Sequence, residues 1–105
     1  MDMIELVKKL AVEKHGEDYL LRQLAEECSE LAQAALKVIR TRHGETPVTP
    51  EEARAKLLEE IADVMVMMDM VIDDDGEAEA IDEIMDAKVE RMLYRMMMAG
   101  RAVDE

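Results

Sequence analysis

The sequence has 105 residues, of which 26 are acidic and 13 are lysine or arginine, and its formal net charge is −13 at pH 7. A negative field of this size repels the phosphates of DNA, RNA and anionic lipids, so it argues against a nucleic-acid binder or a membrane-surface protein. The single cysteine, Cys28, cannot form an internal disulfide, and the apolar-rich run at 61–72 is shorter than the roughly 20 residues that cross a bilayer. We expect one domain over 1–105, without a membrane segment and located in the cytoplasm.

Helix-forming residues dominate the sequence, and the glycines and prolines lie between segments whose apolar residues have helical spacing. The first segment ends before Gly16, and the second starts at Asp18, a residue type that is favoured as an N-cap. The third starts at Thr49 and Pro50, an N-cap followed by a proline at the first helical position, and it stops at the acidic run 73–75. These patterns predict an all-α fold with helices at about 3–14, 18–42, 50–72 and 77–99.

Two of the predicted helices carry a glutamate in the middle of their apolar face. With about 100° per residue, Glu27 falls within the stripe formed by Leu20, Leu24, Leu31 and Val38. Glu60 falls likewise within the stripe formed by Leu57, Val64, Met67 and Val71. Burying an unpaired carboxylate costs several kcal/mol, so a compensating group is expected beside each glutamate.

Each of these glutamates has an acidic partner three residues later. Glu30 follows Glu27 and Asp63 follows Glu60, and this spacing places each pair on one helical face. Four carboxylates that converge from two helices form an all-oxygen ligand set, which suits Mg²⁺ or Mn²⁺ and argues against zinc. Acidic pairs at this spacing also occur by chance on solvated helix faces, but their position on two apolar stripes favours a metal site. Cys28 is expected in the core rather than in catalysis.

The acids lie in two segments, Leu24-Ala-Glu-Glu-Cys-Ser-Glu-Leu-Ala-Gln-Ala34 and Leu58-Glu-Glu-Ile-Ala-Asp-Val-Met65. These segments resemble the two signature helices of the MazG-like all-α nucleoside triphosphate pyrophosphohydrolases, whose motif is EExxE, a loop and then ExxD. The likeness extends from about His15 to Arg95. It implies a four-helix bundle of the MazG-like type that forms a homodimer or a dimer of dimers.

The resemblance also implies roles for individual residues. The family's metal ligands correspond to Glu27, Glu30, Glu60 and Asp63, which would hold Mg²⁺ or its substitute Mn²⁺. Glu26 matches the first glutamate of the motif, and the helical wheel turns it away from Glu27, so its implied role is to orient water or to support the ligands. Either Glu26 or Glu30 would accept the proton of the attacking water.

The last predicted helix carries cations of the kind that the family uses to contact the nucleotide's phosphates. In Ala87-Lys-Val-Glu-Arg-Met-Leu-Tyr-Arg95 they are Lys88, Arg91 and Arg95. Many relatives have an asparagine four residues after that lysine, where this chain has Met92, so the identity of the substrate stays open. Cations near a helix C-terminus are also favoured by the helix dipole alone.

The expected reaction is Mg²⁺-dependent hydrolysis of a nucleoside or deoxynucleoside triphosphate to the monophosphate and pyrophosphate, by attack of water on the α-phosphorus. The resemblance leans toward small members of the family, some of which prefer purine deoxynucleotides, and it implies a part in nucleotide-pool control. Two alternatives stay open. One is a phosphoribosyl-ATP pyrophosphohydrolase on the same scaffold. The other is a non-catalytic acidic helical module that binds a partner protein through a methionine-rich face, formed by Met65, Met67, Met68, Met70, Met96, Met97 and Met98.

Overall fold

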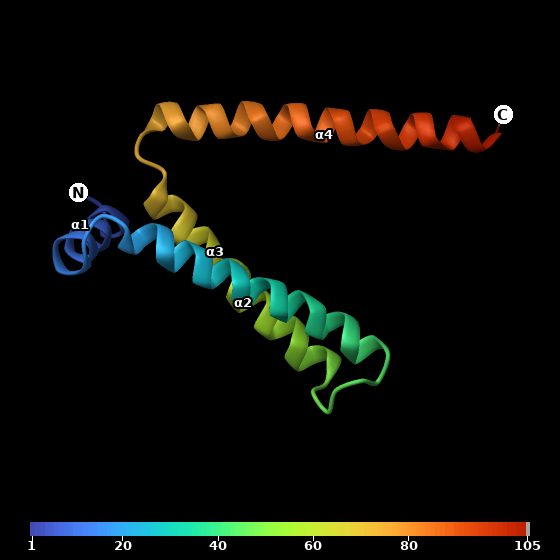
Figure 1. Ribbon diagram of the computed structural model, residues 1–105, viewed down its shortest axis with the longest axis horizontal. Coiled ribbons are helices and arrows are strands. Elements are labelled where there is room, and N and C mark those ends of the chain that lie inside the picture. The colour runs from blue at the N-terminus through green and yellow to red at the C-terminus, as the bar shows by residue number, and fades with distance from the viewer. Residues whose placement is uncertain (105) are drawn as a thin grey trace. The chain divides into compact units, whose positions relative to one another are not determined.

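The computed structural model describes the backbone of residues 1–104 and the side chains of residues 1–99. Over this part of the chain the fold is all-α, as predicted, and it contains no strand. The helices, shown in chain order in Figure 1, are α1 (Met3–His15), α2 (Tyr19–Arg42), α3 (Pro50–Val71) and α4 (Asp75–Asp104). The chain divides into two units, Met1–Val71 with the first three helices and Ile72–Glu105 with α4.

The starts of α1 and α3 are fixed by side-chain caps. The Asp2 carboxylate accepts a hydrogen bond from the Glu5 backbone N–H at 2.8 Å, and the Glu5 carboxylate accepts one from the Asp2 N–H at 3.2 Å. At α3 the Thr49 hydroxyl accepts a hydrogen bond from the Glu52 N–H at 3.2 Å, which confirms the predicted N-cap. Each of these bonds satisfies a backbone donor that has no partner within its helix. The boundaries of α1 and α3 agree with the predicted ones to within one residue.

The boundaries of α4 differ from the predicted range 77–99, because the helix begins at Asp75 and continues to Asp104. The Asp74 carboxylate accepts a hydrogen bond from the Glu77 N–H at 2.8 Å, and the Glu77 carboxylate accepts one from the Asp73 N–H at 2.7 Å. Acidic side chains are stabilising at the positive end of a helix dipole. The acidic run 73–75 therefore follows the end of α3 and also provides the start of α4.

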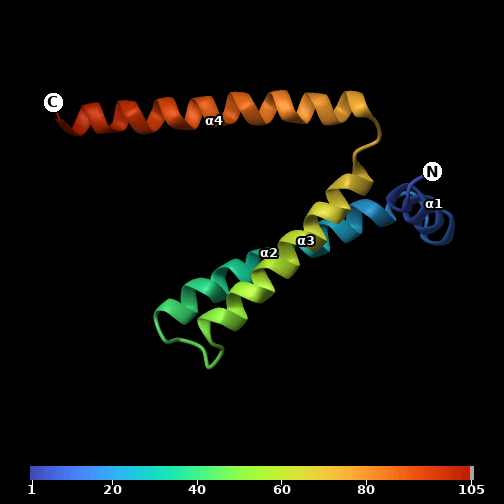
Figure 2. The same cartoon turned by 180° about the vertical axis from the view of Figure 1, so that it is seen from behind.

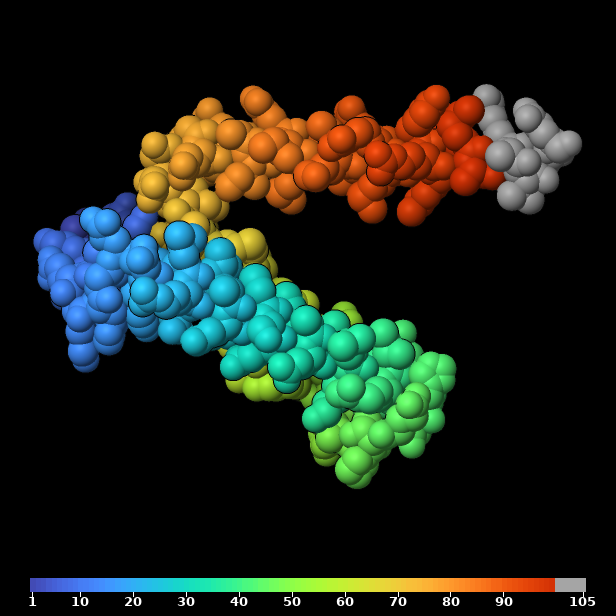
Figure 3. All heavy atoms as spheres, in the orientation of Figure 1, coloured from blue at the N-terminus to red at the C-terminus, as the bar shows by residue number. Residues whose placement is uncertain are grey.

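The core of the first unit lies between α2 and α3. These two helices run side by side in opposite directions, joined by the loop 43–49, and α1 contacts both (Figures 1 and 2). In the space-filling view, α2 lies in front of α3 and hides most of it (Figure 3). The buried residues are Leu20 and Ala34 of α2 and Ala53, Glu60, Val64 and Met70 of α3.

The predicted apolar stripes of α2 and α3 are the faces that meet. Glu27 is half-buried on α2, as are its stripe neighbours Leu24 and Leu31, and Glu60 is buried on α3 beside the buried Val64. Cys28, in contrast, is exposed, so its expected place in the core is wrong. One position after Glu27 on the helix, it is turned by about 100° from the face that meets α3.

The second unit carries apolar side chains that are exposed along α4, among them Ile84, Met85, Val89, Met92 and Met96. Within the described residues, no helix has both the length and the apolar character that are needed to cross a membrane.

Candidate metal centre

Three glutamates from α2 and α3 come together in the first unit. One carboxylate oxygen from each of Glu27, Glu30 and Glu60 lies within 4.8 Å of the other two. Glu27 and Glu30 are three residues apart on α2, and the packing of the two helices brings Glu60 of α3 opposite them. Three converging carboxylates form a cluster that can hold a metal ion.

The burial of Glu60 distinguishes this cluster from an ordinary acidic surface. Its side chain is the only charged one that is buried in the described part of the chain, with 2% of the residue exposed. Its Oε2 atom has no hydrogen-bond partner, and neither has Oε2 of Glu27. A buried carboxylate oxygen without a partner is costly, so a cation or a hydrogen-bond donor that contacted these atoms would be stabilising.

The charges in the cluster oppose one another. Burial raises the pKa of Glu27 above its ordinary value, and the negative charges of Glu30, Asp63 and Glu60 raise this pKa further. A carboxyl group whose pKa is raised in this way is stabilised by whatever positive charge enters the site, whether a proton or a metal ion.

One cation already contacts the cluster. The Nζ atom of Lys56 lies 2.9 Å from Oε1 of Glu60 and 3.7 Å from Oε2 of Glu59. The hydrogen bond to Glu60, together with the charges of Glu59 and Glu60, raises the pKa of Lys56. Lys56 is itself exposed and precedes Glu60 by one helical turn, so it reaches the cluster from the solvent side.

The two other predicted acids lie outside the group of three. Asp63 is exposed on α3, and it is close enough for its charge to raise the pKa of Glu27. Glu26 is exposed on α2 and accepts a hydrogen bond from Nε2 of Gln23 at 3.4 Å. Its position agrees with the helical wheel, which turns it away from Glu27.

The predicted phosphate-contacting cations belong to the second unit. Lys88, Arg91 and Arg95 are exposed on α4, where they line a hollow together with Met92. Their spacing of three and four residues places them on one side of the helix.

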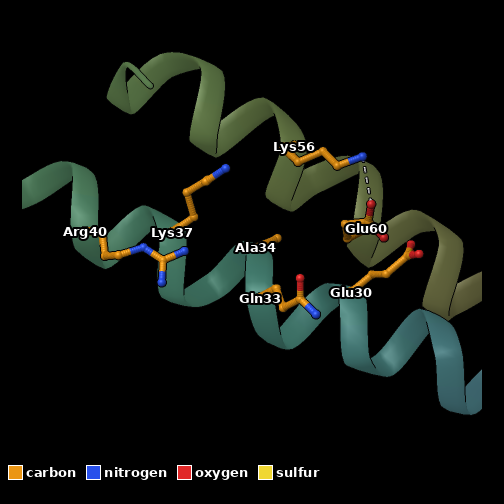
Figure 4. Close-up of a pocket in the computed structure, with 7 residues that line it drawn as sticks. All are labelled: Glu30, Gln33, Ala34, Lys37, Arg40, Lys56 and Glu60. Atoms are coloured by element: carbon orange, nitrogen blue, oxygen red, sulfur yellow. Dashed lines mark ion pairs between the residues drawn. The ribbon is translucent and has the colours of Figure 1, made fainter. Parts of the chain in front are cut away.

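A cavity of about 340 Å³ adjoins the glutamates in the groove between α2 and α3 (Figure 4). It is lined by Glu30, Gln33, Ala34, Lys37, Arg40, Lys56 and Glu60. The three cations of this cavity were not predicted from the sequence, although the spacing of two of them contained a signal. Lys37 lies seven residues after Glu30 and Lys56 lies four before Glu60, so each shares a helical face with a predicted ligand.

Comparisons with models of protein families, with curated proteins and with solved structures find no significant match to this chain.

Proposed function

We propose that this chain is a Mg²⁺-dependent hydrolase that splits a nucleoside or deoxynucleoside triphosphate into the monophosphate and pyrophosphate. The observation that carries the proposal is the buried Glu60, which faces Glu27 and Glu30 and has an oxygen without a partner. A structural role gives no reason to bury this carboxylate between two helices, whereas a metal site requires it.

The donor set fits a hard cation. Glu27, Glu30 and Glu60 offer only carboxylate oxygens, which Mg²⁺ and Mn²⁺ prefer. Asp63, one turn beyond Glu60, is the proposed fourth ligand. When bound, the ion would neutralise charge on the phosphate oxygens.

The carboxylates also serve the water that attacks the α-phosphorus. An oxygen of Glu30 that is not engaged with the metal can accept the proton of this water, and Glu26, one turn before Glu30, is the second candidate for this base. Glu60 is held by Lys56 and by the packing of α3, so it positions the site and is not proposed as the base.

The proposed substrate is itself an anion, and it has to approach a protein whose net charge is −13. A triphosphate does so only where cations lie beside the acidic cluster, because its own charge is repelled by the rest of the protein. The cavity next to Glu30 and Glu60 meets this condition, since Lys37, Arg40 and Lys56 line it.

The exposed apolar side chains of both units support an assembly of several copies. Leu36, Leu58 and Met65 in the first unit and Val89 and Met92 in the second are each more than half exposed. Exposed apolar residues in such number mark protein interfaces. We infer a single MazG-like domain over 1–105, a four-helix bundle that forms a homodimer or a dimer of dimers. Nucleotide-pool control in the cytoplasm is the role that this assignment implies.

Purine deoxynucleotides are the substrates we would test first. A phosphoribosyl-ATP pyrophosphohydrolase would share the metal centre and differ only in the pocket for the rest of the nucleotide, so substrate profiling separates the two.

The test is incubation of the protein with each common NTP and dNTP and with phosphoribosyl-ATP, in Mg²⁺ and in EDTA, followed by chromatography. Monophosphate plus pyrophosphate, lost in EDTA, is the expected result. Inorganic phosphate plus a diphosphate would mean that the wrong bond has been assigned.

The exposed methionines favour a second candidate function, a non-catalytic module that binds a partner protein. The predicted methionine-rich face is only partly exposed, because Met70 is buried and Met67 is half-buried. The exposed methionines, whose flexible side chains suit an adaptable binding surface, are Met65 and Met68 in the first unit and Met96, Met97 and Met98 in the second. A partner-binding role does not explain why Glu60 is buried. Absence of metal-dependent turnover for every nucleotide would favour it over the hydrolase.

A further inference from the structure

We propose that Lys37, Arg40 and Lys56 bind the pyrophosphate portion of the substrate in the cavity between α2 and α3. This inference deepens the proposed function, on which it rests for the identity of the substrate. It assigns the pyrophosphate contact to residues of the same unit as the metal centre, rather than to Lys88, Arg91 and Arg95 of α4.

The charge of the cavity stands out against the rest of the chain. Acidic residues outnumber basic ones two to one in the sequence, with 26 against 13. In this cavity cations are the majority, because three cations and two carboxylates line it. The two carboxylates, Glu30 and Glu60, belong to the proposed metal centre, so a bound metal would leave the whole cavity attractive to an anion.

Two of the three cations have no counter-ion. Among the side chains that the structure describes, neither Lys37 nor Arg40 takes part in an ion pair, although Lys37 is half-buried. The third, Lys56, is paired with Glu60. If Glu60 held a metal ion, Lys56 would keep only its 3.7 Å pair with the exposed Glu59, and its ammonium group could turn toward a ligand at the edge of the cavity. Lys37, Arg40 and Lys56 would then all be available to one ligand.

The arrangement of the lining residues gives the cavity a direction. Glu30 and Glu60 lie at one end, Lys37 extends from α2 toward α3, and Arg40 extends along α2 toward Ala34 (Figure 4). With 1.5 Å of rise per residue, Lys37 follows Glu30 by about 10 Å along α2, and Arg40 follows it by about 15 Å. Ala34 lies between Glu30 and Lys37 along α2, and its small side chain leaves room in the wall of the cavity.

This direction orients the substrate. If the α-phosphate is held at the end of the cavity that Glu30 and Glu60 form, the β- and γ-phosphates point toward Lys37 and Arg40. The pyrophosphate that leaves then lies among cations. Arginine and lysine neutralise the charge that develops on a phosphate leaving group. Gln33, which also lines the cavity, can donate a further hydrogen bond through its amide.

The test is binding of inorganic pyrophosphate to the full chain in Mg²⁺, measured by titration calorimetry. The variant Lys37→Gln/Arg40→Gln should weaken binding about tenfold or more, because each change removes a charged hydrogen-bond donor. Lys37→Arg/Arg40→Lys, which keeps both charges, should retain most of the affinity. The matched control Lys9→Gln/Lys14→Gln removes the same charge from exposed positions of α1 and should change the affinity less than about threefold.

The inference would be overturned if the unmodified protein did not bind pyrophosphate, or if the α1 control weakened binding as much as Lys37→Gln/Arg40→Gln does. It would also be overturned if Lys88→Gln/Arg91→Gln lost binding while Lys37→Gln/Arg40→Gln kept it. Circular dichroism checks that each variant folds, and the single exposed change Arg40→Gln replaces the double variant if that one does not fold. The proposed function fails separately, when the unmodified protein binds pyrophosphate through this cavity but hydrolyses no nucleotide.

Discussion

Lys56 and Glu60 form an ion pair of 2.9 Å in which an exposed lysine neutralises a glutamate whose side chain is only 3% exposed. The lysine reaches one oxygen of Glu60, and the other oxygen has no partner. In the described residues, this is the single place where a charged group is buried in the core between α2 and α3. The stability of the metal-free protein and its response to metal should therefore both depend on these two residues.

Replacing Lys56 should destabilise the metal-free protein. Lys56→Gln leaves the buried Glu60 without its counter-charge, and we expect the free energy of unfolding to fall by more than it does in an exposed control, because Glu60 itself is shielded from solvent. Urea unfolding in EDTA measures this loss. The control is Arg22→Gln, which breaks an exposed ion pair with Asp18 and should cost less than about 0.5 kcal/mol. Equal losses in the two variants would contradict the special role of Lys56.

Mg²⁺ should stabilise the protein through Glu60 more than through Asp63. Ligand binding to the folded state raises the melting temperature, and we expect this rise to vanish in Glu60→Gln and to shrink in Asp63→Asn, because Asp63 is exposed and lies outside the group of three. Differential scanning calorimetry with and without Mg²⁺ checks this order. Glu79→Gln, at an exposed position of α4, should respond to Mg²⁺ as the unmodified protein does. A full response in Glu60→Gln would place the metal elsewhere.

The raised pKa of Glu27 predicts how the metal-free protein responds to pH. A carboxyl group whose pKa is higher in the folded than in the unfolded state binds protons more tightly when folded. Its contribution is therefore most favourable below the unfolded pKa and is lost as the pH rises through the raised folded value. In EDTA, the stability advantage of Glu27→Gln over the unmodified protein should grow with pH from about 4 toward neutrality.

Chemical denaturation of both proteins at several pH values measures this difference. Glu90→Gln, an exposed change of the same kind, should show no such trend. If the stability of Glu27→Gln relative to the unmodified protein did not change with pH, repulsion within the acidic cluster would not be a significant factor.

The Thr49 cap is predicted to stabilise α3, the helix that carries Glu60. Thr49→Ala removes the hydroxyl that accepts a hydrogen bond from the Glu52 N–H, and the expected loss is about 1 kcal/mol in the free energy of unfolding. Ser29→Ala, at an exposed position inside α2, should be close to neutral. Thermal unfolding of the two variants compares them, and a larger loss from Ser29→Ala would show that the Thr49 cap contributes little.

The features that depend on local periodicity could be predicted from the sequence. The helical repeat was sufficient to place Glu27 and Glu60 on the faces that α2 and α3 turn toward each other, and the chemistry of Thr49 and Pro50 was sufficient to locate the start of α3. The start of α4 was missed because Asp74 acts as a cap through its own side chain, whereas an acidic run beside a glycine predicts a loop.

The cavity could not be predicted in the same way, because it depends on which residues of α2 lie opposite which residues of α3. Lys37 and Lys56 are distant in the sequence, and only the packing register of the two helices brings them to one groove. The same register decides that Glu60 is buried while Asp63, on the same helix, is exposed.

The central claim is that water attacks the α-phosphorus of a nucleoside triphosphate at the cluster of Glu27, Glu30 and Glu60. The most direct test is mass spectrometry of the products formed in ¹⁸O-labelled water with Mg²⁺, using the unmodified protein and Glu60→Gln. The account predicts that ¹⁸O enters the monophosphate, that the released pyrophosphate is unlabelled, and that Glu60→Gln forms neither product. Label in the pyrophosphate, release of inorganic phosphate, or normal turnover by Glu60→Gln would contradict it.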